Sequence, residues 1–535
     1  MGNINRKFTV FVILYLSQIS FCQKTDTTQI LEQESENQGL KIQNGWFVQN
    51  HKVIWGSAQH NGWWGGYQES TGWIKQYKVR TAICRNAPGK VGPSYTEDLD
   101  KLTDAMKKYG YPGFEHNYGL WFDRRRDNHD TQKRIDANVA PPLLEQPWIR
   151  STEGRAWDGL PKYDLTQFNT WYFNRLKRFA ELCEQKGTIL FHNFHMQHAL
   201  LENPAHYVDF PWRPVNCIQE TGMPDNIPAA NAFYDISNPN RRKLHELYIN
   251  KCLDELGDYS NIIHFVSQEY TGPLSFMEFW IDTIIIWEQK KGKQVKIGLK
   301  GTKDVIDAIL ADPRRGPKIS TICLSYWWYN TDGTLYSPQG GKEIAGRYIG
   351  NLSKSVSPES LYRQIREYRQ KYPNKAIVQH QKVELEKTWA FLMAGGSMII
   401  GRMQYADSLP PKKPWEPPDD YIAPEESIII QPTYDFINKY LSEYLPNMKP
   451  VNVASNTQKN VWCLANVGQV YLYYSQKGTA IELDLSAIPH NSFKAFWFNP
   501  RSGDIIPATK DITGNNKYTF TTPDNNSWAM LIYRN

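Results

Sequence analysis

Glu269 is the acidic side chain whose position in the sequence most strongly suggests chemistry. It follows Gln268 at the end of the apolar run Ile262–Glu269, so this run predicts a strand that delivers a carboxylate to its carboxyl end. A carboxylic acid at such a place can donate or accept a proton. The alternative is a structural carboxylate that caps a helix or pairs with an arginine.

The other predicted strand ends supply imidazole, amide and guanidinium groups rather than a second carboxylate. The predicted strand Ala376–His380 ends without Asp or Glu, and Glu384 lies farther along the chain. A retaining glycoside hydrolase needs two carboxyl groups about 5–5.5 Å apart, so that mechanism is in doubt. An inverting hydrolase could still recruit Glu115, Asp225 or Asp332.

The imidazoles favour β-elimination at a uronic acid, which needs a screened carboxylate, a base and an acid for the leaving oxygen. Histidine titrates near neutrality without special tuning. We therefore expect His116, His195 and His380 to act with Glu269, all four converging on one pocket. Loss of O4 as water would make the protein a dehydratase, and loss as a sugar would make it a lyase.

Substrate binding is expected from aromatic, amide and basic side chains near the same strand ends. Tyr326, Trp327 and Trp328 close one predicted strand and could stack on sugar rings, although such a run also suits a core. Arg124 and Arg213 could bind carboxylate or sulfate, or else form an exposed rim. The remaining candidates are Asn193, His198, Gln268, Gln379 and Arg402.

A metal site is not expected from the histidines at 192, 195 and 198. Their H-x-x-H-x-x-H spacing is no recognised zinc pattern. On a strand, residues three apart face opposite sides, so only a turn after His195 could bring His195 and His198 together. The sequence predicts no metal and no cofactor.

Eight strand-like runs alternate with eight helix-like segments and predict a (β/α)8 barrel. The expected strands are Val79–Arg85, Tyr111–His116, Thr188–His195, Ile262–Glu269, Val295–Leu299, Ile319–Tyr326, Ala376–His380 and Met398–Arg402. The expected helices are Tyr95–Tyr109, Leu165–Lys186, Pro239–Leu256, Leu274–Lys291, Lys303–Ala311, Pro358–Tyr372, Val383–Ala394 and Pro432–Tyr444. A doubly wound sheet is the alternative, but no glycine-rich phosphate motif follows any strand.

Short alternating strands separated by Gly and Pro predict a small antiparallel β-sandwich after the barrel. We expect a signal peptide at 1–22, a polar segment at 23–44, the barrel at 45–448 and the sandwich at 449–535. The short apolar run Phe8–Phe21 after Arg6 and Lys7 indicates export rather than membrane insertion. Acylation of Cys22 is the less favoured reading, because Phe21 is bulky.

Composition narrows the possible partners. The 535 residues include 19 Trp and 31 Tyr, two residue types that combine a flat face with a polar group and suit sugar binding. The net charge of +6 contains no basic block of the kind that binds nucleic acid. The scattered cysteines form no metal-binding pattern.

The chain resembles exported carbohydrate-active barrel enzymes of Bacteroidetes. The resemblance rests on the strand end Ile263–Glu269, on Phe191–His198 and Tyr207–Arg213, and on Ala495–Gly503 in the C-terminal part. That C-terminal part is similar to the small β domain of apiosidase-like enzymes, and the middle resembles the oligosaccharide dehydratase family of ulvan breakdown. In barrel hydrolases of this kind, the acid/base glutamate stands where Glu269 stands, usually after Asn rather than Gln268.

Residues and resemblance together predict elimination or dehydration at a terminal uronic acid of an anionic oligosaccharide, sulfated or not, such as one from ulvan. Two alternatives remain open. The protein could be a glycoside hydrolase with Glu269 as general acid, or a glycan-binding protein without turnover.

Overall fold

The computed structural model describes most of the chain beyond the N-terminal segment. It covers residues 39–60, 99–116, 146–157, 159–202, 207–208, 210–343, 356–380, 383–402, 427–452, 460–489, 491–508 and 511–535. The expected signal peptide at 1–22, the expected strand Val79–Arg85 and Arg124 lie outside the described residues.

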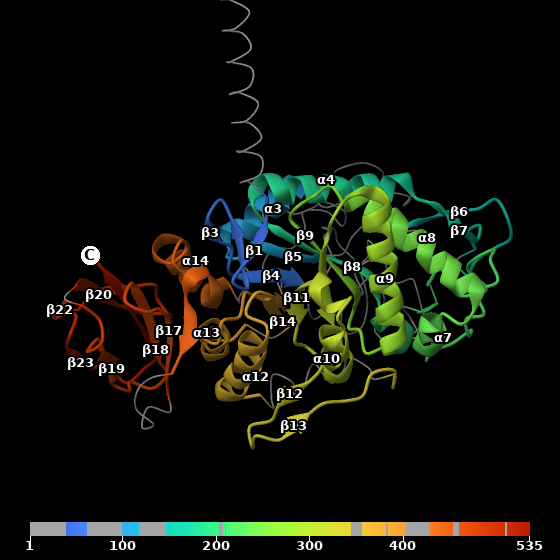
Figure 1. Ribbon diagram of the computed structural model, residues 1–535. Helices are drawn as coiled ribbons and strands as arrows, with labels where there is room; N and C mark the ends of the chain where they lie inside the picture. The colour runs from blue at the N-terminus through green and yellow to red at the C-terminus, as the bar shows by residue number, and fades with distance from the viewer. Residues whose placement is uncertain are drawn as a thin grey trace, which may run out of the picture.

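Eight parallel strands close into the predicted barrel (Figure 1). The strands are β4 Ser57–His60, β5 Gly113–His116, β8 Ile189–Met196, β9 Ile262–Gln268, β10 Lys296–Lys300, β11 Ile319–Cys323, β14 Ala376–His380 and β15 Met398–Arg402. Each strand pairs in parallel with the next one along the chain, and β15 returns to β4. The predicted (β/α)8 architecture is confirmed.

The first barrel strand differs from the prediction. The sequence predicts Val79–Arg85 as this strand, whereas β4 at Ser57–His60 fills the place between β15 and β5. β4 is only four residues long and reads Ser-Ala-Gln-His, which lacks the β-branched run that marks a strand. Hydrogen bonding to β15 and β5 on either side stabilises β4 as a strand, although its own residues have little strand preference.

The predicted helices recur with small shifts at their ends. They are α3 Leu99–Lys108, α4 Thr170–Lys186, α8 Pro239–Leu256, α9 Leu274–Lys291, α10 Lys303–Ala311, α12 Pro358–Lys371, α13 Leu385–Met393 and α14 Ser427–Tyr440. α12 begins as expected, with the Ser357 side chain accepting from Ser360 N and Pro358 in the first turn. α4 starts later than predicted because Asn169 is its cap, and the preceding residues form β7 Tyr163–Phe168, which pairs with β6 Trp148–Arg150.

An apolar layer fills the lower part of the barrel. Inward-facing residues from alternate positions of the strands, such as Phe191, Ile263 and Phe265, form one buried cluster. Gly298 of β10 is required there, because a Cβ atom at that position would lie 2.3 Å from the Phe265 ring. The lumen is therefore a packed core below its carboxyl end.

A small antiparallel sheet covers the amino end of the barrel. It consists of β1 Lys41–Gln43, β2 Trp46–Gln49 and β3 Lys52–Val53. Phe47 of β2 is fully buried and meets the Phe191 ring edge-on, with centroids 6.1 Å apart. The segment expected to be polar up to residue 44 thus ends in a strand that helps to close the barrel.

The C-terminal residues form the predicted antiparallel β unit. Its larger sheet comprises β16 Lys449–Val451, β17 Val461–Asn466, β18 Val470–Ser475, β24 Trp528–Arg534, β20 Ser492–Phe498, β21 Ile505–Pro507 and β22 Ile512–Thr513. The smaller sheet pairs β19 Ile481–Asp484 with β23 Lys517–Phe520.

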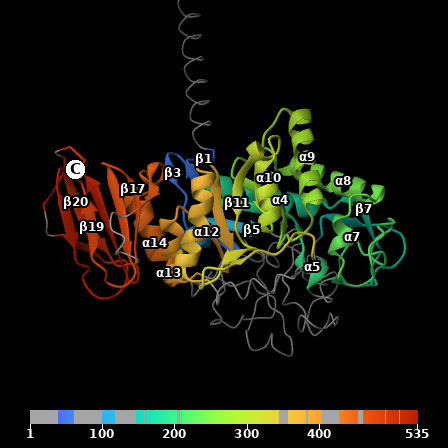
Figure 2. The ribbon, with the colours of Figure 1, turned by 60° about the horizontal axis from the view of Figure 1, so that its bottom comes forward.

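Both faces of the larger sheet are buried. One face packs on β19 and β23, and the opposite face packs on the barrel helices α12, α13 and α14 (Figures 1 and 2). Trp389 of α13 stacks on Tyr474 of β18 at 4.8 Å, and Phe436 of α14 stacks on Phe498 of β20 at 4.1 Å. Barrel and sheet therefore share one apolar core.

Among the helices that the structure describes, none combines the length and the apolar character needed to cross a lipid bilayer.

Candidate active site at the carboxyl end of the barrel

The carboxyl ends of the eight parallel strands meet at one end of the barrel, which we call the mouth. Two polar groups lie there, directly above the apolar layer. The first joins strand ends across the lumen, and the second gathers around Glu269. Active sites of (β/α)8 enzymes lie at this end.

Glu115 is the centre of the first group. Its carboxylate accepts a hydrogen bond from His380 Nε2 at 2.7 Å and one from Asn193 Nδ2 at 3.2 Å, and it pairs with Lys300. These side chains come from four strands, β5, β14, β8 and β10. Glu115 and Lys300 have no exposed side-chain surface. Burial by itself lowers the pKa of Lys300, but the Glu115 carboxylate outweighs this and raises the pKa above its usual value.

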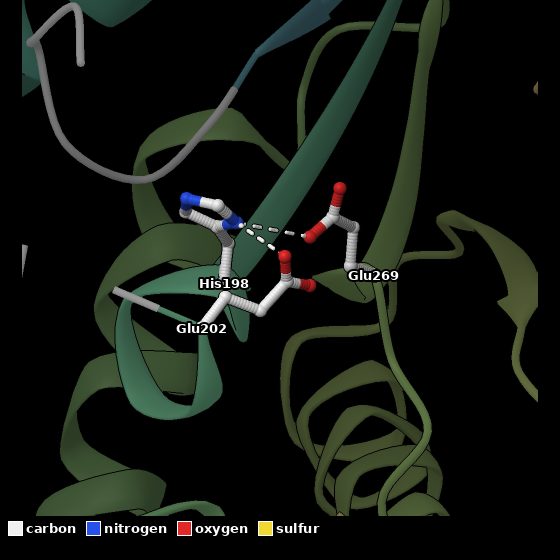
Figure 3. Close-up of side chains that lie close together, drawn as sticks. All are labelled: His198, Glu202 and Glu269. Carbon is white, nitrogen blue, oxygen red and sulfur yellow. Dashed lines mark ion pairs between the residues drawn. The ribbon is translucent and has the colours of Figure 1, made fainter. Parts of the chain in front are cut away.

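The second group consists of His198, Glu202 and Glu269 (Figure 3). His198 Nδ1 lies 3.3 Å from Glu202 Oε2 and 3.5 Å from Glu269 Oε2. The three side chains are 14%, 7% and 17% exposed, so the group is largely buried but still reaches solvent. Burial lowers the pKa of His198, yet the two carboxylates outweigh this effect and raise it to about 10.

The local chain geometry explains how these three side chains meet. The short helix α5 His198–Leu201 starts two residues after β8 and is followed directly by its cap residue Glu202, which places His198 and Glu202 one turn apart. Glu269 directly follows β9 and has a left-handed backbone with φ of 58°, a conformation uncommon for a residue with a side chain. The chain therefore turns out of the extended strand conformation at Glu269.

Gln197 ties the two chain segments together. Its side chain donates to Thr271 Oγ1 at 2.7 Å and accepts from Thr271 N at 3.0 Å, so both ends of the amide are engaged. Its backbone N–H lies 3.1 Å from Ser267 Oγ and from the Gln268 carbonyl oxygen. These buried bonds fix the start of α5 against the end of β9.

Tyr326 links the two groups electrostatically. It lies three residues beyond β11, is 5% exposed, and follows Ser325, whose hydroxyl accepts from His380 N. Burial, reinforced by the Glu269 carboxylate, raises the pKa of Tyr326 well above its usual value. The phenol therefore keeps its proton near neutral pH.

The structure does not bring His116 or His195 to Glu269. His195 packs edge-on against Phe233 and His245, at 4.9 and 5.3 Å, in the layer between barrel and helices. His116 stacks on His192 at 5.7 Å, also outside the lumen. The expectation that both imidazoles converge on Glu269 is therefore corrected. Glu115 points inward, and its neighbour His116 points outward.

The aromatic run after β11 is mostly structural. Trp327 has no exposed surface and packs on Tyr368 of α12 at 5.3 Å. Trp328 is 5% exposed and stacks on Tyr336, at 4.1 Å, across the hairpin of β12 Trp328–Tyr329 and β13 Leu335–Tyr336. Trp327 and Trp328 are thus engaged in packing, and stacking of Tyr326 on a sugar ring stays a prediction.

The remaining candidates are scattered. Gln379 points away from the lumen and donates to Gln364 of α12 at 3.0 Å. Arg213 donates to the Asp225 carbonyl oxygen at 2.8 Å in the long segment after α5. Gln268 is buried at the end of β9. Arg402 ends β15, but its side chain lies outside the described part of the structure, as does the whole of Arg124.

Three residues belong to the site but were not predicted from the sequence: Lys300, Glu202 and Gln197. Lys300 could have been found, because it directly follows the predicted strand Val295–Leu299. A lysine at the carboxyl end of a barrel strand is a candidate for the active site. Glu202 is four residues after His198, the helical spacing, but no helix was predicted there.

Comparison with known proteins places the chain in a family. Residues 12–408, well over half of the chain, match the family described as a domain of unknown function, DUF6298. The chain belongs to the DUF6298 family. Residues 439–532 of this DUF6298 protein match the description "putative collagen-binding domain of a collagenase". No protein of curated function matches it.

Two solved structures share the fold of this DUF6298 protein along nearly its whole length. One is described as a glycoside hydrolase, with 10% identity, a TM-score of 0.52, and coverage of 93% of this chain and 97% of the other. The second is a glycoside hydrolase family 5 protein from Bacteroides vulgatus ATCC 8482, with 11% identity, a TM-score of 0.52, and coverage of 93% and 94%. At such identities the likeness establishes the fold alone.

Proposed function

We propose that this protein is an exported carbohydrate-active enzyme that eliminates across a C–O bond at a terminal uronic acid of an anionic oligosaccharide. The single observation that carries the proposal is the pairing of His380 with Glu115 at the end of β14. An imidazole held by a carboxylate stands where a retaining hydrolase of this fold would need a nucleophile.

The proposed base is His380. Glu115 binds Nε2, so Nδ1 is the nitrogen that would take the proton from the carbon next to the uronate carboxylate. Lys300 and Asn193 hold Glu115 in turn, and this keeps the imidazole orientation fixed. A buried carboxylate that orients an imidazole is an arrangement used for general-base catalysis.

The proposed acid is Tyr326. Burial and the Glu269 carboxylate keep its phenol protonated, so it can give a proton to the oxygen that leaves from C4. The C5–H and C4–O bonds break, a C4–C5 double bond forms, and the oxygen departs as water. The departing group would be a sugar if the uronate were internal, which would make the enzyme a lyase.

The uronate carboxylate must be screened for its neighbouring proton to become acidic. Lys300 and His198 are already paired with Glu115 and with Glu202 and Glu269, respectively. We therefore assign this screening to Arg124, which the sequence predicts to bind carboxylate or sulfate. Algal or plant polysaccharides such as ulvan provide this class of substrate, in keeping with the family resemblance drawn from the sequence.

The test is to incubate the purified protein with oligosaccharides that end in a uronic acid, including those from ulvan, in heavy-oxygen water. We expect a product lighter than the substrate by one water, with the ultraviolet absorbance of an unsaturated uronate and without the isotope. A product that has gained labelled water and new reducing ends would overturn elimination.

Hydrolysis with Glu269 as acid is the second candidate, because a Glu202 oxygen lies within 4.8 Å of a Glu269 oxygen. Two carboxylates so close could divide the acid and nucleophile roles. Both face His198 rather than opposing each other across open space (Figure 3), which makes this candidate second. The isotope experiment separates the two reactions.

A further inference from the structure

We propose that His198, Glu202 and Glu269 form a binding site for a divalent transition-metal cation of the Zn²⁺ or Mn²⁺ type. The three ligand atoms, one imidazole nitrogen and two carboxylate oxygens, lie within 4.8 Å of one another. The sequence alone predicts no metal, because the H-x-x-H-x-x-H pattern does not make a site. The cluster uses only its last histidine, with two glutamates outside the pattern.

The contacts of His198 are unusual for an ordinary ion pair. Its Nδ1 atom faces Glu202 at 3.3 Å and Glu269 at 3.5 Å. One N–H group can point well at only one acceptor, and both distances exceed the usual range of about 2.7–3.2 Å for an N–H···O bond. A single proton therefore serves this arrangement poorly.

The same distances suit a metal. Ligand atoms bound tetrahedrally at about 2.0–2.1 Å from a zinc ion are separated from one another by about 3.3–3.4 Å. The two separations from Nδ1 are 3.3 and 3.5 Å. Both carboxylates also turn toward the same imidazole nitrogen (Figure 3).

The supports of the cluster favour a site that is already formed. Glu202 follows His198 at helical spacing, and Gln197 bonds the start of this helix to the segment that carries Glu269. Hydrogen bonds that fix the positions of ligand-bearing segments strengthen metal binding. The left-handed backbone at Glu269 then directs its carboxylate to the other two groups.

The donor set indicates the kind of cation. Imidazole with carboxylates suits Zn²⁺ and Mn²⁺, whereas Ca²⁺ takes oxygen ligands in larger numbers. Three protein ligands leave further coordination positions for water or substrate, as in catalytic zinc sites. Exposed fractions of 14% and 17% for His198 and Glu269 mean that the cluster is not sealed from solvent.

The use of the cation rests on the proposed function. A divalent ion at the mouth would bind the uronate carboxylate and offset its charge. Elimination requires this screening in addition to a base and an acid. His380 and Tyr326 would keep their roles, since neither belongs to the cluster.

The test is calorimetric titration of the full chain, first treated with chelator, with ZnCl₂ or MnCl₂ alone. We expect one bound ion per chain and a rise in thermal midpoint on saturation. Glu202→Gln keeps shape but removes the charge, and it should weaken binding at least about 100-fold, since even loss of an outer partner of a ligand costs 10–100-fold. CaCl₂ should bind much more weakly than either.

Glu246→Gln is the matched control. Glu246 also pairs with a cation one helical turn away, Arg242 at 3.1 Å, but on the surface of α8. This variant should bind the metal as the wild type does. If Glu202→Gln does not fold, as judged by circular dichroism, Glu269→Gln takes its place in the same comparison.

Two results would overturn the inference: no saturable binding of Zn²⁺ or Mn²⁺ to the wild type, or equal affinity in wild type and the Glu→Gln variant. Because the titration contains no substrate, it is independent of the proposed reaction. Metal binding without elimination would refute the proposed function alone, and elimination by a chain that binds no metal would refute this inference alone.

Discussion

Acid should destabilise this protein well above the pH at which carboxylates become protonated, because several histidines are buried behind the barrel. Burial lowers the pKa of His116, His245 and His264 from 6.5 to about 3. Between these two values the unfolded chain binds protons that the folded chain excludes. The contribution of these three histidines to stability is therefore complete above pH 6.5 and is lost as the pH falls below it.

The size of the effect follows from the shift. At pH 5, which is 1.5 units below 6.5, each such histidine costs about 2 kcal/mol, at 1.36 kcal/mol per unit. Three acting independently cost about 6 kcal/mol, a large share of a typical total stability of about 5–15 kcal/mol. His192 and His195, whose pKa values burial also lowers, add to this loss.

The assay is urea unfolding, followed by tryptophan fluorescence, at several pH values between 6.5 and 4.5. His245→Gln removes one titrating group and keeps an amide that can donate to the Phe233 carbonyl oxygen, which lies 2.9 Å from His245 Nε2. The slope of unfolding free energy against pH should fall by about 1.4 kcal/mol per unit. The control is His51→Gln, the same substitution at an exposed histidine.

The reasoning would be refuted by a free energy of unfolding that stays level from pH 6.5 to 4.5. It would also be refuted by equal slopes in wild type and His245→Gln, since the buried imidazole would then not be the source of the proton uptake.

Three further predictions concern the mouth and the C-terminal sheet. Lys300→Met should lower the free energy of unfolding in urea by about 3–5 kcal/mol, because the Glu115 charge is then buried without its partner. The double variant with Glu115→Gln should recover much of this loss. No recovery would mean that the two charges are not coupled. His380→Asn should lower kcat for elimination by about 10²–10⁴-fold, whereas His195→Phe should leave initial rates unchanged; equal losses in both variants would contradict the assigned places. Tyr474→Ala should cost about 3–5 kcal/mol and leave one calorimetric transition for the whole chain, and two separate transitions would count against a shared core.

Much of the fold could be predicted because its elements carry strong local patterns. α8, α9 and α10 begin and end where their apolar spacing predicted. β4 could not be predicted, since Ser57–His60 has no strand preference and exists through its neighbours on both sides. The covering sheet formed by β1 to β3 was also missed; its strands are only 3, 4 and 2 residues long, too short to show a clear alternation.

The site could be predicted only where side-chain direction follows from strand alternation. Glu269 and His380 lie at the mouth as strand ends should. His195 does not, because Phe194 and His195 both pack on Tyr248 of α8, so regular alternation is lost near the end of β8. Lys300 belongs to the site because it pairs with Glu115, which lies far away in the sequence. Glu202 belongs to it because a turn of helix that the sequence does not signal brings it to His198.

The burial of both faces of the larger C-terminal sheet restricts how this chain can be divided or recombined. A protein shortened to end before Lys449 would present the aromatic flank of α12, α13 and α14 to water, and we expect it to aggregate rather than to survive as a lone barrel. Exchange of this unit for that of another enzyme would likewise require matching rings opposite Trp389 and Phe436. We therefore expect related proteins to retain both parts, and substitutions on one side of this contact to be matched by substitutions on the other.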